Sequence, residues 1–131
     1  MYKNPILVLI LPFLFSCATV TEDTVSRFES RCPEMTTEER VAHTKLPYYR
    51  PPPTYPRDAA NNGIEGYAEF EFDVSISGMP INIGVIESYP SDIFVNAALR
   101  SVRGYKYEVK MENGQPVIDY CQNIIVQFQF G

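Results

Sequence analysis

The sequence predicts an α+β domain in which one helix packs on one face of a three-stranded antiparallel sheet. Apolar and polar residues alternate over residues 66–76 and again over 81–85, which is the pattern of strands with one buried face. Apolar residues then recur at helical spacing over 92–103, and the alternation returns over 124–130. We therefore expect a β-hairpin, a helix and a closing strand, in this order.

The first strand of the hairpin begins at Gly66 and alternates in chemistry along its length. Its apolar face consists of Ala68, Phe70, Phe72, Val74 and Ile76. Its other face carries three carboxylates, Glu69, Glu71 and Asp73. We expect these carboxylates to face solvent, because charges keep the open face of an antiparallel sheet soluble. A turn at residues 77–80 leads into the second strand, in which Ile81, Ile83 and Val85 continue the alternation.

Signals at both ends predict the helix. Ser91 and Asp92 suit its start, and the cations Arg100 and Arg103 precede Gly104 at its end. Its apolar face is formed by Phe94, Ala97, Ala98 and Val102.

The closing strand follows a turn at Asn113-Gly114. It places Ile124, Val126, Phe128 and Phe130 on one face and Ile125, Gln127 and Gln129 on the other. We expect Val126 and Phe128 to close the core. A closing strand at the edge of a sheet also presents unpaired amides and carbonyls to an incoming peptide.

Residues 1–16 have the pattern of a signal peptide, with Lys3 followed by an apolar run over 6–15. The run is too short for a membrane span, which needs about 20 residues. It ends in Leu-Phe-Ser before Cys17, a spacing that resembles a bacterial lipobox, so we expect acyl chains such as palmitate on Cys17. The alternative is an ordinary signal peptide followed by a chance cysteine.

The residue after the lipidated cysteine bears on the location of the protein. In known lipoproteins an aspartate there favours the inner membrane, whereas this chain has Ala18. We expect a periplasmic protein anchored through Cys17 to the outer membrane rather than to the inner membrane. Several acyl chains make a durable anchor, because each buried methylene contributes about 0.8 kcal/mol.

Residues 17–50 are expected to be a tether that leads to a domain over residues 51–131. Thr36 followed by Glu38 and Glu39 predicts a short helix that continues to Lys45. The proline-rich stretch 47–56 favours polyproline II. It is interpreted as a linker, with a docking peptide for an aromatic groove as the alternative.

Two cysteines remain besides Cys17. Cys32 and Cys121 form an even pair, and in an oxidising periplasm an even pair is a candidate disulfide. Two separate buried thiols are the alternative. A disulfide closing such a long loop would stabilise the fold by about 4 to 5 kcal/mol in the chain-entropy model.

The sequence offers no chemistry for catalysis. The formal net charge is −5 and the basic residues are dispersed, so nucleic acid is not an expected partner. His43 is the single histidine and is expected to lie on the surface. Phosphate loops, nucleophile elbows and zinc patterns are missing from the sequence. We expect no catalytic residue, no metal site and no cofactor.

The segment 53–66 contains Tyr55-Pro56, then Ala59 and Ala60, then Gly-Ile-Glu-Gly. This string is similar to the start of TonB C-terminal domains, and the resemblance covers residues 51–130. The chain has Tyr105-Lys106-Tyr107 where family members have tryptophan, any residue and then tyrosine or phenylalanine. The match continues through Phe70, Phe72, Val74, Gly78, Ser88, Phe94, Ala97, Ala98, Val102, Tyr107, Asn113, Gly114, Pro116 and Val117.

The resemblance implies a binding module rather than an enzyme. In that family two or more strands of a small sheet receive an extended receptor segment, the TonB box, by strand addition. The domain thereby pulls on the plug of an outer-membrane transporter for iron chelates or cobalamin. The candidate partner-binding residues are Tyr55, Pro56, Ile125, Gln127 and Gln129. The partner would be an outer-membrane TonB-dependent receptor or a protein of the TonB complex.

Three functions stay open at this point. The first is the TonB-like module that contacts receptors or a TonB complex. The second is a structural envelope lipoprotein that binds peptidoglycan or another envelope protein. The third is a short true TonB energy transducer with an uncleaved anchor, although a lipid in place of a membrane helix would not engage the proton-driven motor. A homodimer is compatible with each.

Overall fold

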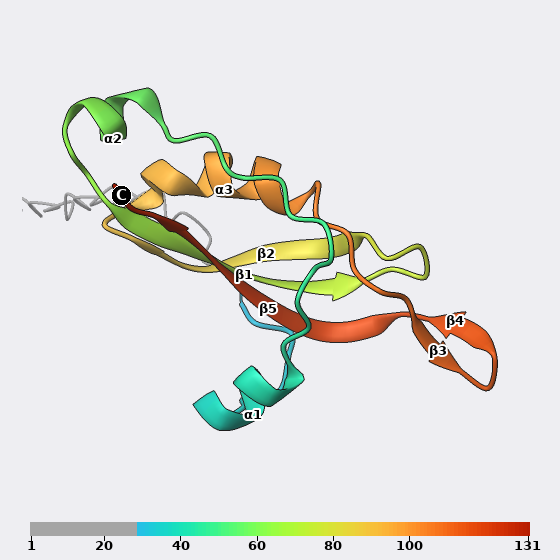
Figure 1. Ribbon diagram of the computed structural model, residues 1–131. Coiled ribbons are helices and arrows are strands. Elements are labelled where there is room, and N and C mark those ends of the chain that lie inside the picture. Colours follow the sequence, from blue (N-terminus) through green and yellow to red (C-terminus); the bar gives the residue numbers. More distant parts are fainter. Residues whose placement is uncertain (1–28) are drawn as a thin grey trace, which may run out of the picture.

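The computed structural model describes residues 29–131, and Cys17 and the signal sequence lie outside these residues. A three-stranded antiparallel sheet of order β2-β1-β5 has α3 on one face and α1 on the other (Figure 1). The elements are α1 Thr37–His43, α2 Arg57–Asn61, β1 Gly66–Val74, β2 Pro80–Tyr89, the 3₁₀ turn η1 Asp92–Phe94, α3 Val95–Val102, β3 Lys110–Glu112, β4 Gln115–Val117 and β5 Asp119–Phe128. The predicted α+β class and strand connectivity are confirmed.

β1 is the central strand. It pairs with β2 from Tyr67↔Tyr89 to Val74↔Pro80, and with β5 from Gly66↔Phe128 to Val74↔Asp119. With a strand on each side and a helix on each face, β1 buries every residue over 68–74. β5 has a strand on one side alone, so its other side forms an edge of the sheet.

The face of the sheet toward α3 contains the apolar core. Phe94 and Phe128 stack with ring centroids 4.4 Å apart. Ile76 was predicted to continue the apolar face of the first strand, and this is wrong: it lies in the turn after β1 and is 57% exposed. The buried core residues are Ala59, Ala68, Phe70, Phe72, Val74, Phe94, Ala97, Ala98, Val102, Tyr105, Tyr107, Ile124, Val126 and Phe128.

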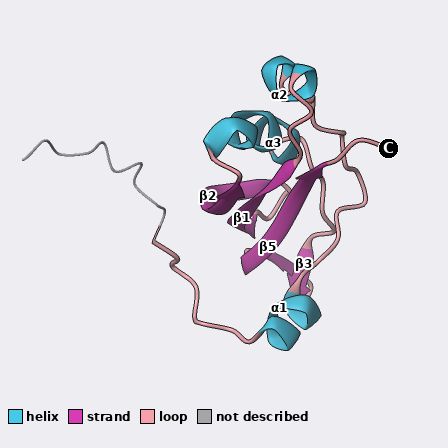
Figure 2. Ribbon diagram, turned by 90° about the vertical axis from the view of Figure 1, so that its left-hand side faces the viewer, coloured by secondary structure: helices cyan, strands magenta, loops and turns pink. Residues whose placement is uncertain are grey.

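The opposite face contradicts the prediction of three solvated carboxylates. Glu69, Glu71 and Asp73 are 8%, 5% and 0% exposed. They are buried because the chain upstream of the family-like segment folds against this face, as the position of α1 in Figure 2 shows. The predicted alternation of the strand is confirmed, but its polar side is an interior surface.

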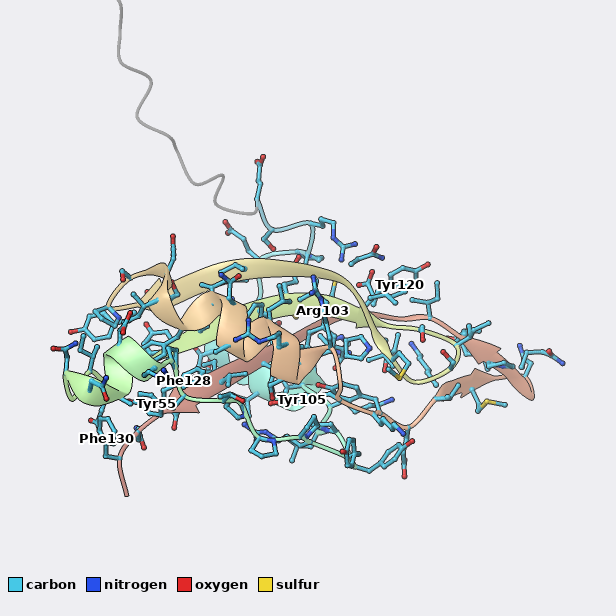
Figure 3. All side chains as sticks on the ribbon, turned by 90° about the horizontal axis from the view of Figure 1, so that it is seen from above. Tyr55, Arg103, Tyr105, Tyr120, Phe128 and Phe130 are labelled. Atoms are coloured by element: carbon cyan, nitrogen blue, oxygen red, sulfur yellow. A yellow bond between two sulfur atoms is a disulfide. The ribbon has the colours of Figure 1, made fainter. Side chains whose placement is uncertain are left out.

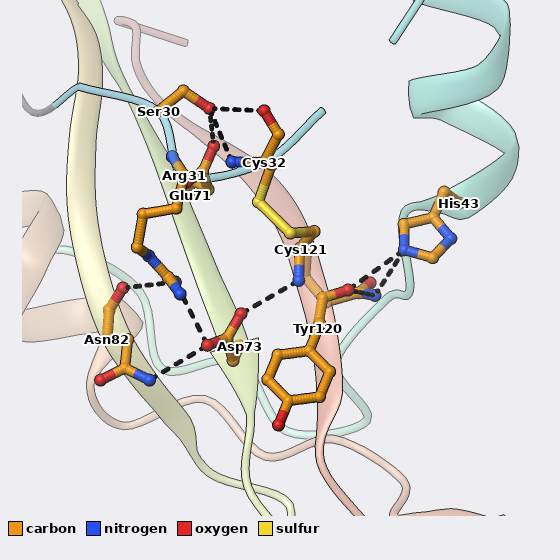
Figure 4. Close-up of polar contacts among 10 residues, drawn as sticks. Ser30, Arg31, Cys32, His43, Glu71, Asp73, Asn82, Tyr120 and Cys121 are labelled. Carbon is orange, nitrogen blue, oxygen red and sulfur yellow. Dashed lines mark hydrogen bonds and ion pairs between the residues drawn. A yellow bond between two sulfur atoms is a disulfide. The ribbon is translucent and has the colours of Figure 1, made fainter. Parts of the chain in front are cut away.

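Polar partners compensate the buried carboxylates (Figure 4). Asp73 accepts hydrogen bonds from Arg31 at 3.2 Å, from the Asn82 side chain at 3.0 Å and from the Cys121 amide at 3.0 Å. Glu71 accepts from the hydroxyl of Ser30 and from the amide of Arg31. Because a buried charge is tolerated only with such partners, residues 30–31 complete the folded domain.

A disulfide fastens the upstream chain to the sheet. Cys32 and Cys121 are joined with their Cα atoms 5.7 Å apart, across a sequence separation of 89 residues. Cys121 has a φ of 62° and lies where the register between β1 and β5 shifts. Such a bulge changes the direction of the side chain of its residue. Here it brings the Sγ of Cys121 to Cys32, on the face of the sheet away from α3.

The predicted short helix is α1. The hydroxyl of Thr36 accepts from the Glu39 amide at 3.2 Å, and the Glu39 carboxylate accepts from the Thr36 amide at 2.8 Å. This reciprocal pair is a capping box. The helix ends at His43, two residues before the expected Lys45, and it buries none of its side chains.

The proline-rich stretch is extended and packs on the domain rather than hanging free. The amides of Tyr48 and Tyr49 lie 2.9 and 3.4 Å from the carbonyl of Lys106. Farther along, the Ser101 hydroxyl donates to the Pro51 carbonyl. A Cβ on Gly104 would lie 2.9 Å from the Pro51 ring, so this glycine permits the close approach.

Candidate functional site

The outer edge of β5 is the first component of the candidate site. Within residues 29–131, the backbone hydrogen bonds outside helices and sheets involve no group of residues 123–128. Near residue 120 the edge is closed, because the His43 ring nitrogen lies 3.2 Å from the Tyr120 carbonyl and the Lys45 amide donates to the Gln122 side chain at 3.0 Å. The open stretch therefore runs from residue 123 to residue 128, and its unpaired groups form a template for another strand.

The side chains of this stretch alternate as the sequence predicts. Ile124, Val126 and Phe128 are 7%, 1% and 2% exposed and point into the core. Ile125 is 44% exposed, and Gln127 is exposed on the same opposite face. Gln129 is also exposed but lies beyond the end of β5.

The strand ends earlier than expected. Phe130 was predicted as the last inward residue of the alternation, and this is wrong, because β5 stops at Phe128 and Phe130 is 47% exposed. The Phe130 amide instead donates to the Glu65 carboxylate at 2.7 Å. This side-chain contact turns the end of the chain out of the sheet ladder.

Tyr55 packs at the same end of β5 (Figure 3). Its ring stacks on Phe130 with centroids 4.9 Å apart and meets Phe94 and Phe128 edge-on at 5.8 and 5.5 Å. Its hydroxyl donates to the Ile64 carbonyl at 2.5 Å. Desolvation, with a smaller effect of the Glu65 carboxylate, raises the pKa of Tyr55.

The structure brings some of the predicted site residues together and separates others. Tyr55 lies beside Phe128, so it borders the open stretch of β5 at one end. Pro56 occupies the N-cap position of α2 and leads the chain into that helix. Ile125 and Gln127 lie on the face of β5 that is directed away from α3.

A groove between α1 and β5 is the component that the sequence did not predict. Its volume is about 620 Å³. Its lining comprises Thr37, Arg40, Val41, Thr44, Leu46, Glu69, Asn123, Ile124 and Ile125. A signal was present in the spacing of Thr37, Arg40, Val41 and Thr44, which puts all four on one side of a helix.

The charges inside the groove are paired with each other. Arg40 lies 3.3 Å from the Glu69 carboxylate, and Asn123 donates to the same oxygen at 2.7 Å. In the described part of the chain, no group of three His, Cys, Asp or Glu side chains is placed to hold a metal ion. Residues 29–131 also contain no helix that is long and apolar enough to cross a membrane.

These features define a small interaction domain that offers an open strand edge beside a groove. Residues 51–130 match the family model described as Gram-negative bacterial TonB protein C-terminal. The chain therefore belongs to the TonB C-terminal family, whose domain is a non-enzymatic protein-interaction module.

Relatives of known name agree with this assignment. A protein TonB of Pseudomonas aeruginosa is 33% identical over 66 residues, covering 50% of this chain and 19% of that protein. A protein TonB of Salmonella typhimurium is 27% identical over 110 residues, covering 76% of this chain and 44% of that protein. The chain thus spans less than half the length of these two relatives.

Solved structures agree as well. The solution structure of the Pseudomonas aeruginosa TonB C-terminal domain superposes with a TM-score of 0.55 at 28% identity, covering 65% of this chain and 85% of that chain. A TonB2 protein from Vibrio anguillarum superposes with a TM-score of 0.52 at 22% identity, covering 79% of this chain and 93% of that chain. The second likeness supports the fold alone.

Proposed function

We propose that this protein is a periplasmic binding module that takes up an extended segment of an outer-membrane TonB-dependent receptor, or of a TonB complex protein, as an added strand. The observation that carries the proposal is the open edge of β5 over residues 123–128 in a member of the TonB C-terminal family. The bound segment would link the protein to TonB-dependent uptake of iron chelates or similar ligands.

The chemistry of the edge supports an extended partner. Main-chain hydrogen bonds provide much of the affinity in strand addition, and pockets for alternate side chains provide the specificity. Ile125 and Gln127 offer one apolar and one polar neighbour to such a strand on the face away from α3. Val126 and Phe128 stay in the core and hold β5 in place beneath the partner.

The location is part of the proposal. A lipid on Cys17 would tether the domain to a membrane facing the periplasm, with the outer membrane favoured because Ala18 follows the cysteine. The protein would then assist or modulate uptake beside the receptors without engaging the proton-driven motor.

The binding step is tested with synthetic peptides that contain the TonB boxes of receptors from the same bacterium. Titration into the ¹⁵N-labelled protein should shift the amide resonances of residues 123–128 most strongly. Matched peptides that are N-methylated on the alternate amides that face β5 cannot donate the ladder hydrogen bonds and should leave those resonances in place. Absence of any shift with the unmodified peptides would refute strand addition at this edge.

The anchor is tested by intact mass spectrometry of the protein purified from its native membrane. We expect the mass of residues 17–131 plus acyl chains. An unprocessed and unacylated mass would contradict the proposed lipoprotein and favour the energy transducer instead. The peptide titration and the mass measurement are independent, so each part of the proposal stands or fails by itself.

A further inference from the structure

We infer that α1 is a side wall of the β5 edge and selects partner segments whose side chains on that side are aliphatic and uncharged. The inference rests on the proposed strand addition, and it assigns a specificity-determining surface to residues 37–46, upstream of the family-matched segment 51–130.

The exposed side of α1 that lines the groove is the first observation. Thr37, Arg40, Val41 and Thr44 share one side of the helix and line the groove opposite β5. No residue of α1 is buried, and Val41 is 71% exposed. Leu46, three residues beyond the end of the helix, is 75% exposed. The helix therefore presents apolar surface toward the strand without packing on it.

Polar contacts hold α1 beside β5, although none of its side chains is buried. A helix of seven residues is unstable in isolation, so its position must come from tertiary contacts. The ion pair of Arg40 with Glu69 ties it to β1. At its end, the amide of Lys45 bonds to Gln122, and the ammonium of Lys45 lies 3.0 Å from Asp119. The disulfide of residue 32 fixes the chain before the helix.

The shape of the edge indicates an extended peptide as the occupant. The groove is continuous with the open backbone of residues 123–128, since Asn123, Ile124 and Ile125 line it. Residues 43–45 close one end of that stretch, and the ring of Tyr55 beside Phe128 borders the other. The open stretch of residues 123–128 is six residues long and spans about 17 Å at the usual rise.

The side-chain preference follows from alternation and charge. Every second side chain of an added strand would point to the face on which α1 lies, where it would meet Val41, Leu46 and Ile125. Arg40 and Glu69 already neutralise each other, so a charged side chain placed there would lose hydration without gaining a partner. An aliphatic side chain would instead remove apolar surface from water on both sides of the groove.

The test uses the full-length protein and the receptor peptide that binds it most tightly. The double variant Val41→Ser/Leu46→Ser should bind about tenfold more weakly by calorimetry. The control Ile76→Ser changes another exposed apolar residue, 57% exposed and remote from the groove, and should bind as the wild type does. Circular dichroism checks that all three proteins share one fold.

Peptide variants sharpen the test. Aspartate in place of the aliphatic residues that point toward α1 should abolish measurable binding to the wild type and cost much less in the double variant. Unchanged affinity of the double variant would overturn the inference while leaving strand addition intact. If no peptide binds the wild type, the proposed function fails, and the inference with it. Sedimentation measures whether the protein associates with itself. Self-association that Val41→Ser/Leu46→Ser abolishes, and that added peptide does not disrupt, would assign the groove to a second copy of the chain instead.

Discussion

The two faces of the central strand β1 are both buried, but by different means. The face toward α3 is covered by apolar side chains from the family-matched segment, such as Phe72 and Phe94. The opposite face carries Glu69, Glu71 and Asp73 and is covered by residues 29–45 through hydrogen bonds, ion pairs and a disulfide. A strand of alternating pattern can therefore bury its polar side as well when a distant segment supplies matching polar groups.

The apolar face and the polar face also stabilise the fold in different ways. Apolar burial is nondirectional and stabilises the fold in proportion to its area. The polar face depends on particular partners, so its stabilisation is lost when one partner is removed. Substitutions on the two faces should therefore differ in size and in their dependence on the upstream chain.

The largest expected effect comes from removing the cross-link of the polar face. The double variant Cys32→Ser/Cys121→Ser loses a bond across 89 residues, and the free energy of unfolding should fall by about 4 to 5 kcal/mol in the chain-entropy model. Urea denaturation measures the loss. The wild type in reductant should match the variant, and a loss below about 1 kcal/mol would mean that the bond contributes little.

An apolar truncation on the other face should cost nearly as much. Phe72 is fully buried against Tyr107, with ring centroids 5.4 Å apart, so Phe72→Ala should lower the free energy of unfolding by about 3 to 5 kcal/mol. Ile76→Ala, in the exposed turn after the same strand, should change it by less than about 0.5 kcal/mol. Equal effects at both positions would contradict the assigned core.

An intermediate effect is expected at the centre of the polar face. Asp73→Ala removes the acceptor of Arg31, Asn82 and the Cys121 amide, and should cost about 2 kcal/mol. The guanidinium of Arg31 is partly exposed and regains water, which limits the loss. In a double-mutant cycle, Asp73→Ala and Arg31→Ala should be coupled, and simple additivity would show that the contact contributes nothing.

The smallest effect concerns the helix of the polar side. Thr36→Ala removes the N-cap hydroxyl of α1 and should cost about 1 kcal/mol. Thr36→Ser keeps the hydroxyl and serves as its control. Hydrogen exchange of the α1 amides should accelerate in Thr36→Ala and not in Thr36→Ser. Acceleration in both variants would show that loss of the capping box is not the cause.

The sequence predicts the elements whose signals are local. Alternation over residues 66–74 and 124–128 and the helical spacing over 94–102 were enough for the sheet, its helix and the outward positions of Ile125 and Gln127. The short α2 and the hairpin of β3 and β4 were missed, because they contain five and three residues and leave little periodicity.

The burial of the carboxylates and the groove could not be predicted in the same way. Both arise because residues 29–45 fold back on strands that follow them by 30 to 90 positions, and no local pattern encodes that contact. The even pair of Cys32 and Cys121 indicates that the upstream chain meets the last strand, whereas the helical spacing of residues 37–44 indicates one side of a helix and not what that side faces. A disulfide fixes the position of one residue of the upstream chain. It does not predict on which side of the sheet the rest of that chain lies.

Strand addition at the β5 edge would be seen directly in a crystal structure of the protein with a bound TonB-box peptide. We predict a fourth strand beside β5 over residues 123–128, with alternate peptide side chains against Val41 of α1 and Leu46 just beyond it. A peptide on the outer edge of β2, or one bound away from both sheet edges, would contradict it.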